Sequence, residues 1–447
     1  MKNWITIAFV FILGVINAQT NPAITSWMQN TTIKARHYVA GNSTPINDSS
    51  PVNCQAVQYN TTDVYVTTTG LPSYVTGPFL DGNPSIASNQ NAIFRIPLNP
   101  VPNTGTPVNT TGGNIGIFIN GVALFDYRDG VAWNNTTQSL CGGPGNSPCP
   151  GGMGATQNWN RDAIPAEKKG FDCSKAHPAM GNYHHHQNPS AFNLDLVVIS
   201  TICNLYNADG LYAIDSTLHS PLIGYAYDGF PIYGAYGYQN ADGSGPIVRI
   251  KSSYSLNSGN TRTLGPDVSN TYPLGYFRED YHYTATSAGT PDYLDEHNGR
   301  FCVTPEYPSG IYCYFATVDA NWNSTYPYVV GPTFYGTRNA AKVTSVPSGT
   351  TTYSSTASND KINLQATQVK VFPSPTNDLI IIQLIDINKE NLKVELFDMT
   401  GRLVETTSLL QGSTIAYFDV QTLYSGQYLV KISNKNSVII QKIVVTK

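Results

Sequence analysis

Charged side chains are scarce in this sequence. Lys, Arg, Asp and Glu together make up 12% of the chain, which is about half of their usual share in globular proteins. The formal net charge is -4, and no basic block interrupts the sequence. Because binding to a phosphate backbone needs clustered Lys and Arg, the composition argues against nucleic acid as a partner. The 29 Tyr, 38 Gly and 29 Pro are instead typical of an extracellular protein with short strands and many turns.

Familiar catalytic motifs are missing as well. The sequence contains no G-x-S-x-G elbow, no H-E-x-x-H, no P-loop and no glycine-rich dinucleotide fingerprint. Ser220 follows His219, but adjacency along the chain does not orient an imidazole onto its neighbour's hydroxyl, so a serine triad has no support. The sequence leaves open whether the chain is an enzyme.

Long apolar runs are absent beyond the N-terminus. The chain begins with MKNWITIAFVFILGVINAQT, in which Lys2 precedes an apolar stretch from Ile5 to Ile16 and Ala18 offers a cleavage point. This pattern predicts a secretory signal peptide over residues 1–18. Since no later stretch of about 18 apolar residues exists, we expect the mature chain to be soluble or attached to a surface.

Export makes the 7 cysteines candidates for disulfides. Cys302 and Cys313 flank a Pro-Ser-Gly turn between two strand-like runs, which would place them roughly opposite one another. The segment CGGPGNSPC could close a small loop between Cys141 and Cys149 in the same way. Spacing alone does not determine connectivity, and one cysteine must be left over. The alternative for Cys173, which lies near several histidines, is a thiolate that binds a metal.

The composition changes near residue 345. Residues 345–365 are rich in Ser and Thr and lack apolar periodicity, which indicates a linker, and every His and Cys lies before them. Residues 366–447 contain alternating or β-branched runs broken by Asn-Asp, Thr-Gly and Ser-Gly turns. This pattern predicts a small antiparallel β-sandwich.

The tail resembles the C-terminal sorting domain of the type IX secretion system of Bacteroidota. The resemblance rests on three segments: Pro373 to Asp378, Leu396 to Arg402 and Leu423 to Lys431. The family usually has Asn where this chain has Ser374. The resemblance implies that the outer-membrane type IX secretion machinery is a partner, that the tail is removed, and that the product is released or attached to the cell surface. A carbohydrate-binding β-sandwich is the alternative.

The segment before the linker is predicted to be mostly β. TTDVYVTTTGLPSY alternates, NAIFRIP is a short strand, and NIGIFINGVALFDYRDG indicates a hairpin around Asn120-Gly121. NLDLVVIST could be a buried strand or one helical turn. The best helix candidate is the short RDAIPAEKKGF, which Pro165 interrupts. Long amphipathic periodicity is absent, so we predict no Rossmann-like or TIM-barrel fold.

Three consecutive histidines stand in the segment GNYHHHQNP, although the whole chain contains only 8. In an extended strand His184 and His186 face one way, while Tyr183 and His185 face the other. A turn at Gly181 would bring a further histidine back to them. Neutral imidazoles commonly bind metal ions, and three of them with a carboxylate or water suit Zn or Cu. The candidate ligands are His177, His184, His186 and His219, with Asp172 and Asp228 as orienting residues or additional ligands.

These histidines have a structural alternative. A histidine between Gly and Pro can simply hydrogen-bond a carbonyl group and stabilise a turn, and adjacent histidines in a loop can be solvated. His37, His282 and His297 are isolated in the sequence, and we interpret them as structural or exposed. The aromatic segment YDGFPIYG is likewise interpreted as a structural corner, except for Asp228.

The segment around the histidines resembles the YHYH-domain proteins, which are named after a Tyr-His-Tyr-His motif. The matching positions are Asn120–Val122, Trp159, Asp162–Ala163, His177–Pro178, Gly181–His186, Pro189, His219–Pro221, Gly224–Gly234, Asp295–Arg300 and Thr304–Pro308. His185 replaces the second Tyr of the name motif, whereas both histidines of the motif are retained. The family has no settled activity, so the resemblance does not explain the site.

We therefore predict a mainly β protein with three parts after the signal peptide. The first is a YHYH-type body at residues 19–344, with a core at about 90–340. A linker at 345–365 and a sorting domain at 366–447 follow it.

The first functional hypothesis is an exported protein whose histidine-rich site binds a divalent metal ion, Zn or Cu, with a complete shell of protein ligands. The second is a metal-dependent hydrolase or copper oxidoreductase with an open coordination position beside a cleft. The third is an adhesive or glycan-binding surface protein without metal, which would present an exposed Tyr/Trp platform.

Overall fold

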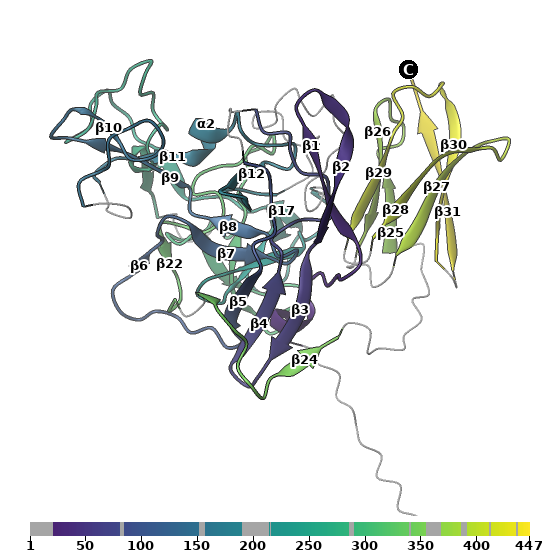
Figure 1. Cartoon of the computed structure of the whole chain (residues 1–447), viewed down its shortest axis with the longest axis horizontal. Helices are drawn as coiled ribbons and strands as arrows, with labels where there is room; N and C mark the ends of the chain where they lie inside the picture. The colour runs from purple at the N-terminus through teal and green to yellow at the C-terminus, as the bar shows by residue number, and fades with distance from the viewer. Residues whose placement is uncertain are drawn as a thin grey trace, which may run out of the picture.

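The computed structural model describes residues 21–80, 85–151, 157–189, 214, 216–285, 290–338, 341–354, 368–385, 391–410, 413–434 and 437–447. The predicted mainly β fold is confirmed (Figure 1). The α-helices within these ranges are two short ones, α1 (Pro22–Thr25) and α2 (Ala163–Glu167). The predicted signal peptide and the segment NLDLVVIST, residues 193–201, lie outside the described residues.

An antiparallel sheet of five strands contains the first predicted strands. Its order is β23-β5-β4-β3-β24, and its members are β3 (Cys54–Tyr59), β4 (Asp63–Thr68), β5 (Ala92–Pro97), β23 (Ala341–Val343) and β24 (Thr351–Tyr353). The predicted segment TTDVYVTTTGLPSY contains β4, and NAIFRIP contains β5. Val64 and Val66 on β4 are fully buried, as expected for β-branched residues on a packed sheet.

A mixed sheet of eight strands forms the centre of the molecule. Its order is β12-β13-β8-β7-β14-β15-β21-β20, where the pairs β13/β8 and β15/β21 are parallel and the others antiparallel. The strands are β7 (Asn114–Phe118), β8 (Ala123–Phe125), β12 (Ala176–Ala179), β13 (Asn182–His185), β14 (Leu222–Ala226), β15 (Pro231–Tyr233), β20 (Gly299–Cys302) and β21 (Ile311–Phe315). The histidine-rich segment therefore lies at one edge of this sheet.

The predicted hairpin around Asn120-Gly121 is confirmed and connects β7 to β8. Gly121 has φ +80, and a Cβ atom added there would lie 2.1 Å from Thr68 Oγ1. The Asn120 side chain accepts a hydrogen bond from the Val122 backbone N–H at 3.1 Å. Glycine is needed both for the left-handed conformation and for the close approach of the two sheets.

In the described part of the body, further smaller sheets and the 3-10 helix η3 (Arg278–Asp280) accompany these two sheets. Strands β9 (Arg128–Asn134), β10 (Ser139–Cys141) and β11 (Asn160–Asp162) form a three-stranded sheet. The two-stranded sheets are β1 (Lys34–Val39) with β2 (Asn42–Pro51), β16 (Tyr236–Tyr238) with β17 (Ile247–Arg249), β18 (Tyr254–Leu256) with β19 (Tyr281–Tyr283), and β22 (Thr333–Phe334) with β6 (Val108–Asn109).

Aromatic side chains fill the core of the body. Tyr127, Tyr183, Tyr225, Tyr233 and Tyr314 are each exposed by 1% or less. Buried tyrosines usually hydrogen-bond through their hydroxyl groups, as the 2.7 Å bond from Tyr183 Oη to Asp172 illustrates. Much of the abundant tyrosine is therefore packed inside the molecule.

The tail forms two antiparallel sheets with a core of its own, and the predicted β-sandwich is confirmed (yellow-green to yellow in Figure 1). One sheet has the order β25-β26-β29 and the other β28-β27-β30-β31. The strands are β25 (Val369–Phe372), β26 (Leu379–Leu384), β27 (Leu392–Asp398), β28 (Leu403–Leu409), β29 (Ile415–Asp419), β30 (Gly426–Ser433) and β31 (Val438–Val445).

Candidate metal centre

A tight hairpin brings the first histidine to the other two. Strands β12 and β13 are antiparallel, and His177 is paired directly with His184. The turn consists of Met180 and Gly181, which both have positive φ angles, 50° and 81°, as a two-residue type I′ hairpin turn requires. The expected turn at Gly181 is therefore present, and it places both imidazoles on the same face of the hairpin.

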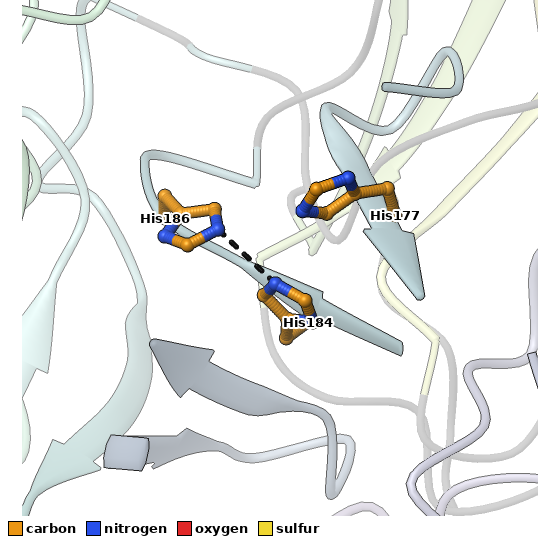
Figure 2. Close-up of side chains that lie close together, drawn as sticks. All are labelled: His177, His184 and His186. Atoms are coloured by element: carbon orange, nitrogen blue, oxygen red, sulfur yellow. Dashed lines mark hydrogen bonds between the residues drawn. The ribbon is translucent and has the colours of Figure 1, made fainter. Parts of the chain in front are cut away.

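Strand alternation then adds the third histidine. His184 and His186 extend to the same side, and their Nε2 atoms are 3.1 Å apart (Figure 2). His177, His184 and His186 each offer one ring nitrogen, and these nitrogens all lie within 4.8 Å of one another. His185 extends to the opposite side, where its Nε2 lies 3.0 Å from the Tyr74 hydroxyl.

Backbone carbonyl groups determine the tautomers of two of these imidazoles. His184 Nδ1 lies 2.8 Å from the Asn182 carbonyl oxygen, and His186 Nδ1 lies 2.7 Å from the Asp126 carbonyl oxygen. Since a carbonyl oxygen only accepts hydrogen bonds, each Nδ1 must carry the proton and donate it. In a neutral imidazole the lone pair then lies on Nε2, the atom that points to the centre of the cluster. Metal-binding histidines are commonly oriented in this way.

A glutamate that we did not predict from the sequence completes the cluster. Glu167 is the last residue of α2, the helix predicted from RDAIPAEKKGF, and Asp162 caps that helix by accepting a hydrogen bond from the Ile164 backbone N–H. Glu167 Oε2 lies 3.2 Å from His177 Nε2 and 3.2 Å from His186 Nε2. The only sequence signal was a carboxylate on a short helix ten positions before a histidine, which does not by itself indicate a contact.

Burial and mutual contacts shift the pKa values of the cluster. Burial, together with the neighbouring His186 and His177, lowers the pKa of His184 well below its usual value. Burial also lowers the pKa of His186, but contact with Glu167 outweighs this and leaves it raised. Burial would raise the pKa of Glu167, but its contacts with His177 and His186 lower it instead. His184 is therefore neutral and Glu167 ionised at neutral pH, which are the forms that bind metal ions.

Two phenylalanines pack against the histidines of the cluster. The Phe125 ring stacks on His184 with centroids 3.8 Å apart, and Phe171 meets His177 edge to face at 5.0 Å. His177, His184 and His186 are exposed by 7%, 2% and 3%. Such low exposure strengthens the electrostatic interactions within the cluster.

Asp172 lies apart from the cluster, although its sequence position suggested a ligand or an orienting residue. Its carboxylate accepts hydrogen bonds from Tyr183 Oη at 2.7 Å and from the backbone N–H groups of Gly77, Ser174 and Ala176. Burial raises the pKa of Asp172 to about 7. These contacts hold Tyr183 and the start of β12, on the side of β13 that faces away from the histidine cluster.

His219 and Asp228 are not brought to the cluster either. His219 packs against Tyr233, Tyr238 and Phe315, and burial lowers its pKa to about 4. Asp228 accepts hydrogen bonds from Tyr314 Oη at 2.5 Å and from two backbone N–H groups. Of the six ligands predicted from the sequence, the structure thus gathers His177, His184 and His186.

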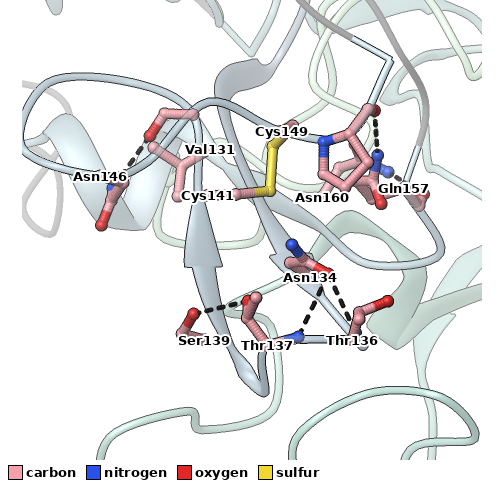
Figure 3. Close-up of a disulfide and its surroundings, with 12 residues drawn as sticks. Val131, Asn134, Thr136, Thr137, Ser139, Cys141, Asn146, Cys149, Gln157 and Asn160 are labelled. Carbon is pink, nitrogen blue, oxygen red and sulfur yellow. Dashed lines mark hydrogen bonds between the residues drawn. A yellow bond between two sulfur atoms is a disulfide. The ribbon is translucent and has the colours of Figure 1, made fainter.

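The cysteines only partly match the predicted pairings. The disulfide between Cys141 and Cys149 is confirmed (Figure 3). The predicted pairing of Cys302 with Cys313 is wrong because both are free thiols. In the β20–β21 hairpin Cys302 pairs with Ile311 and Cys313 with Arg300, so the cysteines are diagonal neighbours. Cys173 is disulfide-bonded, which excludes the alternative of a thiolate that binds a metal.

Comparisons with known proteins agree with this architecture. The family model of the YHYH protein matches residues 93–327, which is more than half of the chain, and the chain therefore belongs to this family. The model of the secretion system C-terminal sorting domain matches residues 370–446. This domain indicates recognition by the type IX secretion system and export to the outer cell surface.

Other comparisons add little. A search of curated proteins found no match. Among solved structures, the chain is similar to a DUF3244 family protein with an immunoglobulin-like β-sandwich fold from Bacteroides vulgatus, with 14% identity and a TM-score of 0.16. That similarity covers 17% of this chain and 83% of the other. No helix in the described part of the chain is long and apolar enough to cross a membrane.

Proposed function

We propose that this exported protein binds a divalent transition metal ion, Zn or Cu, at His177, His184 and His186. The observation that carries the proposal is the convergence of three ring nitrogens within 4.8 Å of one another inside a buried site. Imidazole suits both Zn and Cu. The proposed function of this YHYH-family protein is therefore metal binding at the cell surface.

The purely structural alternative requires an additional proton at the central contact. His184 and His186 each donate from Nδ1 to a carbonyl oxygen, yet their Nε2 atoms lie only 3.1 Å apart. Two neutral imidazoles in these tautomers would direct two lone pairs at each other. Either a proton on one Nε2 or a bound cation relieves this repulsion, and a metal ion relieves it for all three rings at once.

The other hypotheses find less support. A hydrolase or oxidoreductase needs an open coordination position beside a cleft, whereas the three histidines are exposed by 7% or less. An adhesive Tyr/Trp platform needs exposed rings. The buried tyrosines of the core do not provide them, although Tyr283 and Tyr424 are exposed by 36% and 87%. A site that holds its ion, rather than one that processes a substrate, is the function that the geometry supports best.

Elemental analysis of the full-length protein, purified without a histidine tag, tests the proposal. The comparison is with a His184→Ala/His186→Ala double variant and with His282→Ala, an exposed histidine outside the cluster. We expect near-stoichiometric Zn or Cu in the unchanged protein and in His282→Ala, and loss of the metal in the double variant. Absence of metal from all three, after incubation with Zn²⁺ and Cu²⁺, would disprove metal binding and leave the cluster with a structural role.

A further inference from the structure

We infer that Glu167 is the fourth protein ligand of this centre and closes a tetrahedral coordination shell around an ion such as Zn²⁺. This inference rests on the metal binding proposed above and adds the ligand that sequence analysis did not find. It also decides between an open and a closed site, because four protein ligands leave no position for a substrate in a tetrahedral shell.

The first argument is geometric. Glu167 Oε2 lies 3.2 Å from His177 Nε2 and from His186 Nε2, and the two Nε2 atoms of His184 and His186 are 3.1 Å apart. With metal–ligand bonds of about 2.0–2.1 Å, the edges of a tetrahedron of ligand atoms measure about 3.3–3.4 Å. Three of the distances between these four atoms are therefore already close to those of a four-coordinate site.

The second argument concerns an unsatisfied oxygen. Glu167 Oε2 is buried, and no donor among the described residues is aligned to give it a hydrogen bond. A buried carboxylate oxygen without a partner is costly. Its nearest polar neighbours are the Nε2 atoms of His177 and His186, the nitrogens that would bind the ion. A metal between the four atoms would satisfy the carboxylate and the imidazole lone pairs together.

The third argument concerns the path to solvent. The Glu167 side chain is exposed by 24%, compared with 9% and 3% for the side chains of His177 and His186. Glu167 is the most exposed of these three side chains, although its Oε2 atom is buried, and an ion that dissociates toward solvent on this side passes the carboxylate. A carboxylate bound to the ion retains it by its negative charge. Removing that charge should therefore accelerate release of the metal.

Release of Zn²⁺ from the loaded full-length protein to a colorimetric chelator tests the inference. Glu167→Gln keeps the shape of the side chain and removes its charge, and we expect about tenfold faster release or more. Glu279→Gln is the matched control: the Glu279 side chain is also exposed by 24% but bonds Asn160 and Arg278 instead of the histidines. It should release Zn²⁺ at the unchanged rate.

The outcomes separate the two proposals. If the unchanged protein holds Zn²⁺ and Glu167→Gln releases it no faster, Glu167 is not a ligand, while metal binding by the histidines stands. If the unchanged protein holds no Zn²⁺, metal binding itself fails. Should Glu167→Gln not fold, Co²⁺ in the unchanged protein decides, since four-coordinate Co²⁺ absorbs visible light far more strongly than six-coordinate Co²⁺. Strong bands are expected, and weak bands would overturn the closed shell.

Discussion

At the scale of single residues, neighbouring histidines have entirely different surroundings. His184 and His186 point into the candidate centre, whereas His185 lies between Phe118 and Tyr183 on the other side of the strand. Burial and the nearby Lys175 lower the pKa of His185 to about 3, so it stays neutral. The one position where this chain departs from the Tyr-His-Tyr-His motif therefore faces away from the candidate centre.

Restoring the tyrosine of the motif should consequently leave the centre intact. We expect His185→Tyr to retain the metal content of the unchanged protein, while the larger ring in a packed space lowers the free energy of unfolding by about 1–3 kcal/mol. Elemental analysis and thermal unfolding of the same preparation measure both effects. A folded His185→Tyr protein with half the metal or less would show that His185 supports the site directly.

Asp228 offers a second test at the residue scale, through the pH dependence of stability. Burial raises the pKa of Asp228 from 3.8 to about 6, despite hydrogen bonds from Tyr314, Gly336 and Phe230 that lower it. The folded state therefore binds this proton more tightly than the unfolded state. The resulting stabilisation is complete below about pH 4 and is lost as the pH rises through 6, a change of about 3 kcal/mol.

Replacing Asp228 with Asn should remove this contribution. Denaturant unfolding at pH 4 and pH 7 measures the free energy of unfolding of both proteins. We expect the change between the two pH values to differ between Asp228→Asn and the unchanged protein by about 3 kcal/mol, with the unchanged protein losing more stability at pH 7. Parallel pH dependence of the two proteins would contradict the raised pKa.

At the scale of secondary structure, one hairpin and one short helix form the centre. The β12–β13 hairpin positions all three histidines, and α2 supplies the carboxylate. Gly181 closes the hairpin with φ +81, and a Cβ atom there would lie 2.1 Å from Ser88 Oγ. The turn is therefore constrained both by its backbone conformation and by contact with the segment before β5.

Substitution of this glycine separates the two constraints. Gly181→Ala should cost more than the about 1–2 kcal/mol that a left-handed conformation imposes on an alanine, and it should weaken metal binding because His177 depends on the turn. Gly41→Ala is the control, since Gly41 has φ +82 but nothing within 4 Å of an added Cβ. Equal losses of stability in the two variants would show that the contact with Ser88 is unimportant.

At the scale of the whole molecule, the body that carries the candidate centre and the sorting domain have separate cores. The core of the tail is drawn from residues between Val369 and Val445, and every histidine and cysteine lies before them. A chain that ends after β24, at Ser354, should therefore keep the candidate ligands in place but lose the segment that the type IX secretion system recognises.

Cells that produce this truncated chain test the separation. We expect the protein to be absent from the cell surface, as measured by protease treatment of intact cells. It should accumulate in the compartment that the outer membrane encloses. The accumulated protein should retain the metal content of the full-length chain. Surface display of the truncated chain at the normal level would contradict the role of the tail, and loss of metal from a folded truncated chain would contradict the independence of the centre.

Local sequence patterns were enough to predict the elements in and around the histidine site. They predicted the Asn120-Gly121 turn and the α2 segment. They also predicted that His184 and His185 face opposite ways and that His177 folds back to His184, because each of these features depends on a few neighbouring residues. Contacts between residues far apart in the sequence could not be predicted from local patterns. His219 and Asp228 have suitable chemistry, but tertiary packing places them against other aromatic residues. Cys302 and Cys313 flank a real hairpin, yet its register makes them diagonal neighbours.

The sequence by itself determined the mainly β fold, the sorting tail and the candidate histidines His177, His184 and His186. It could do so because turn chemistry, strand alternation and family motifs act over short stretches of chain. Only the tertiary structure decided that Glu167 joins these histidines and that Asp172, His219 and Asp228 do not. That choice depends on how α2 packs beside the β12–β13 hairpin and how the buried carboxylates find hydrogen-bond donors, and both are properties of contacts between distant segments.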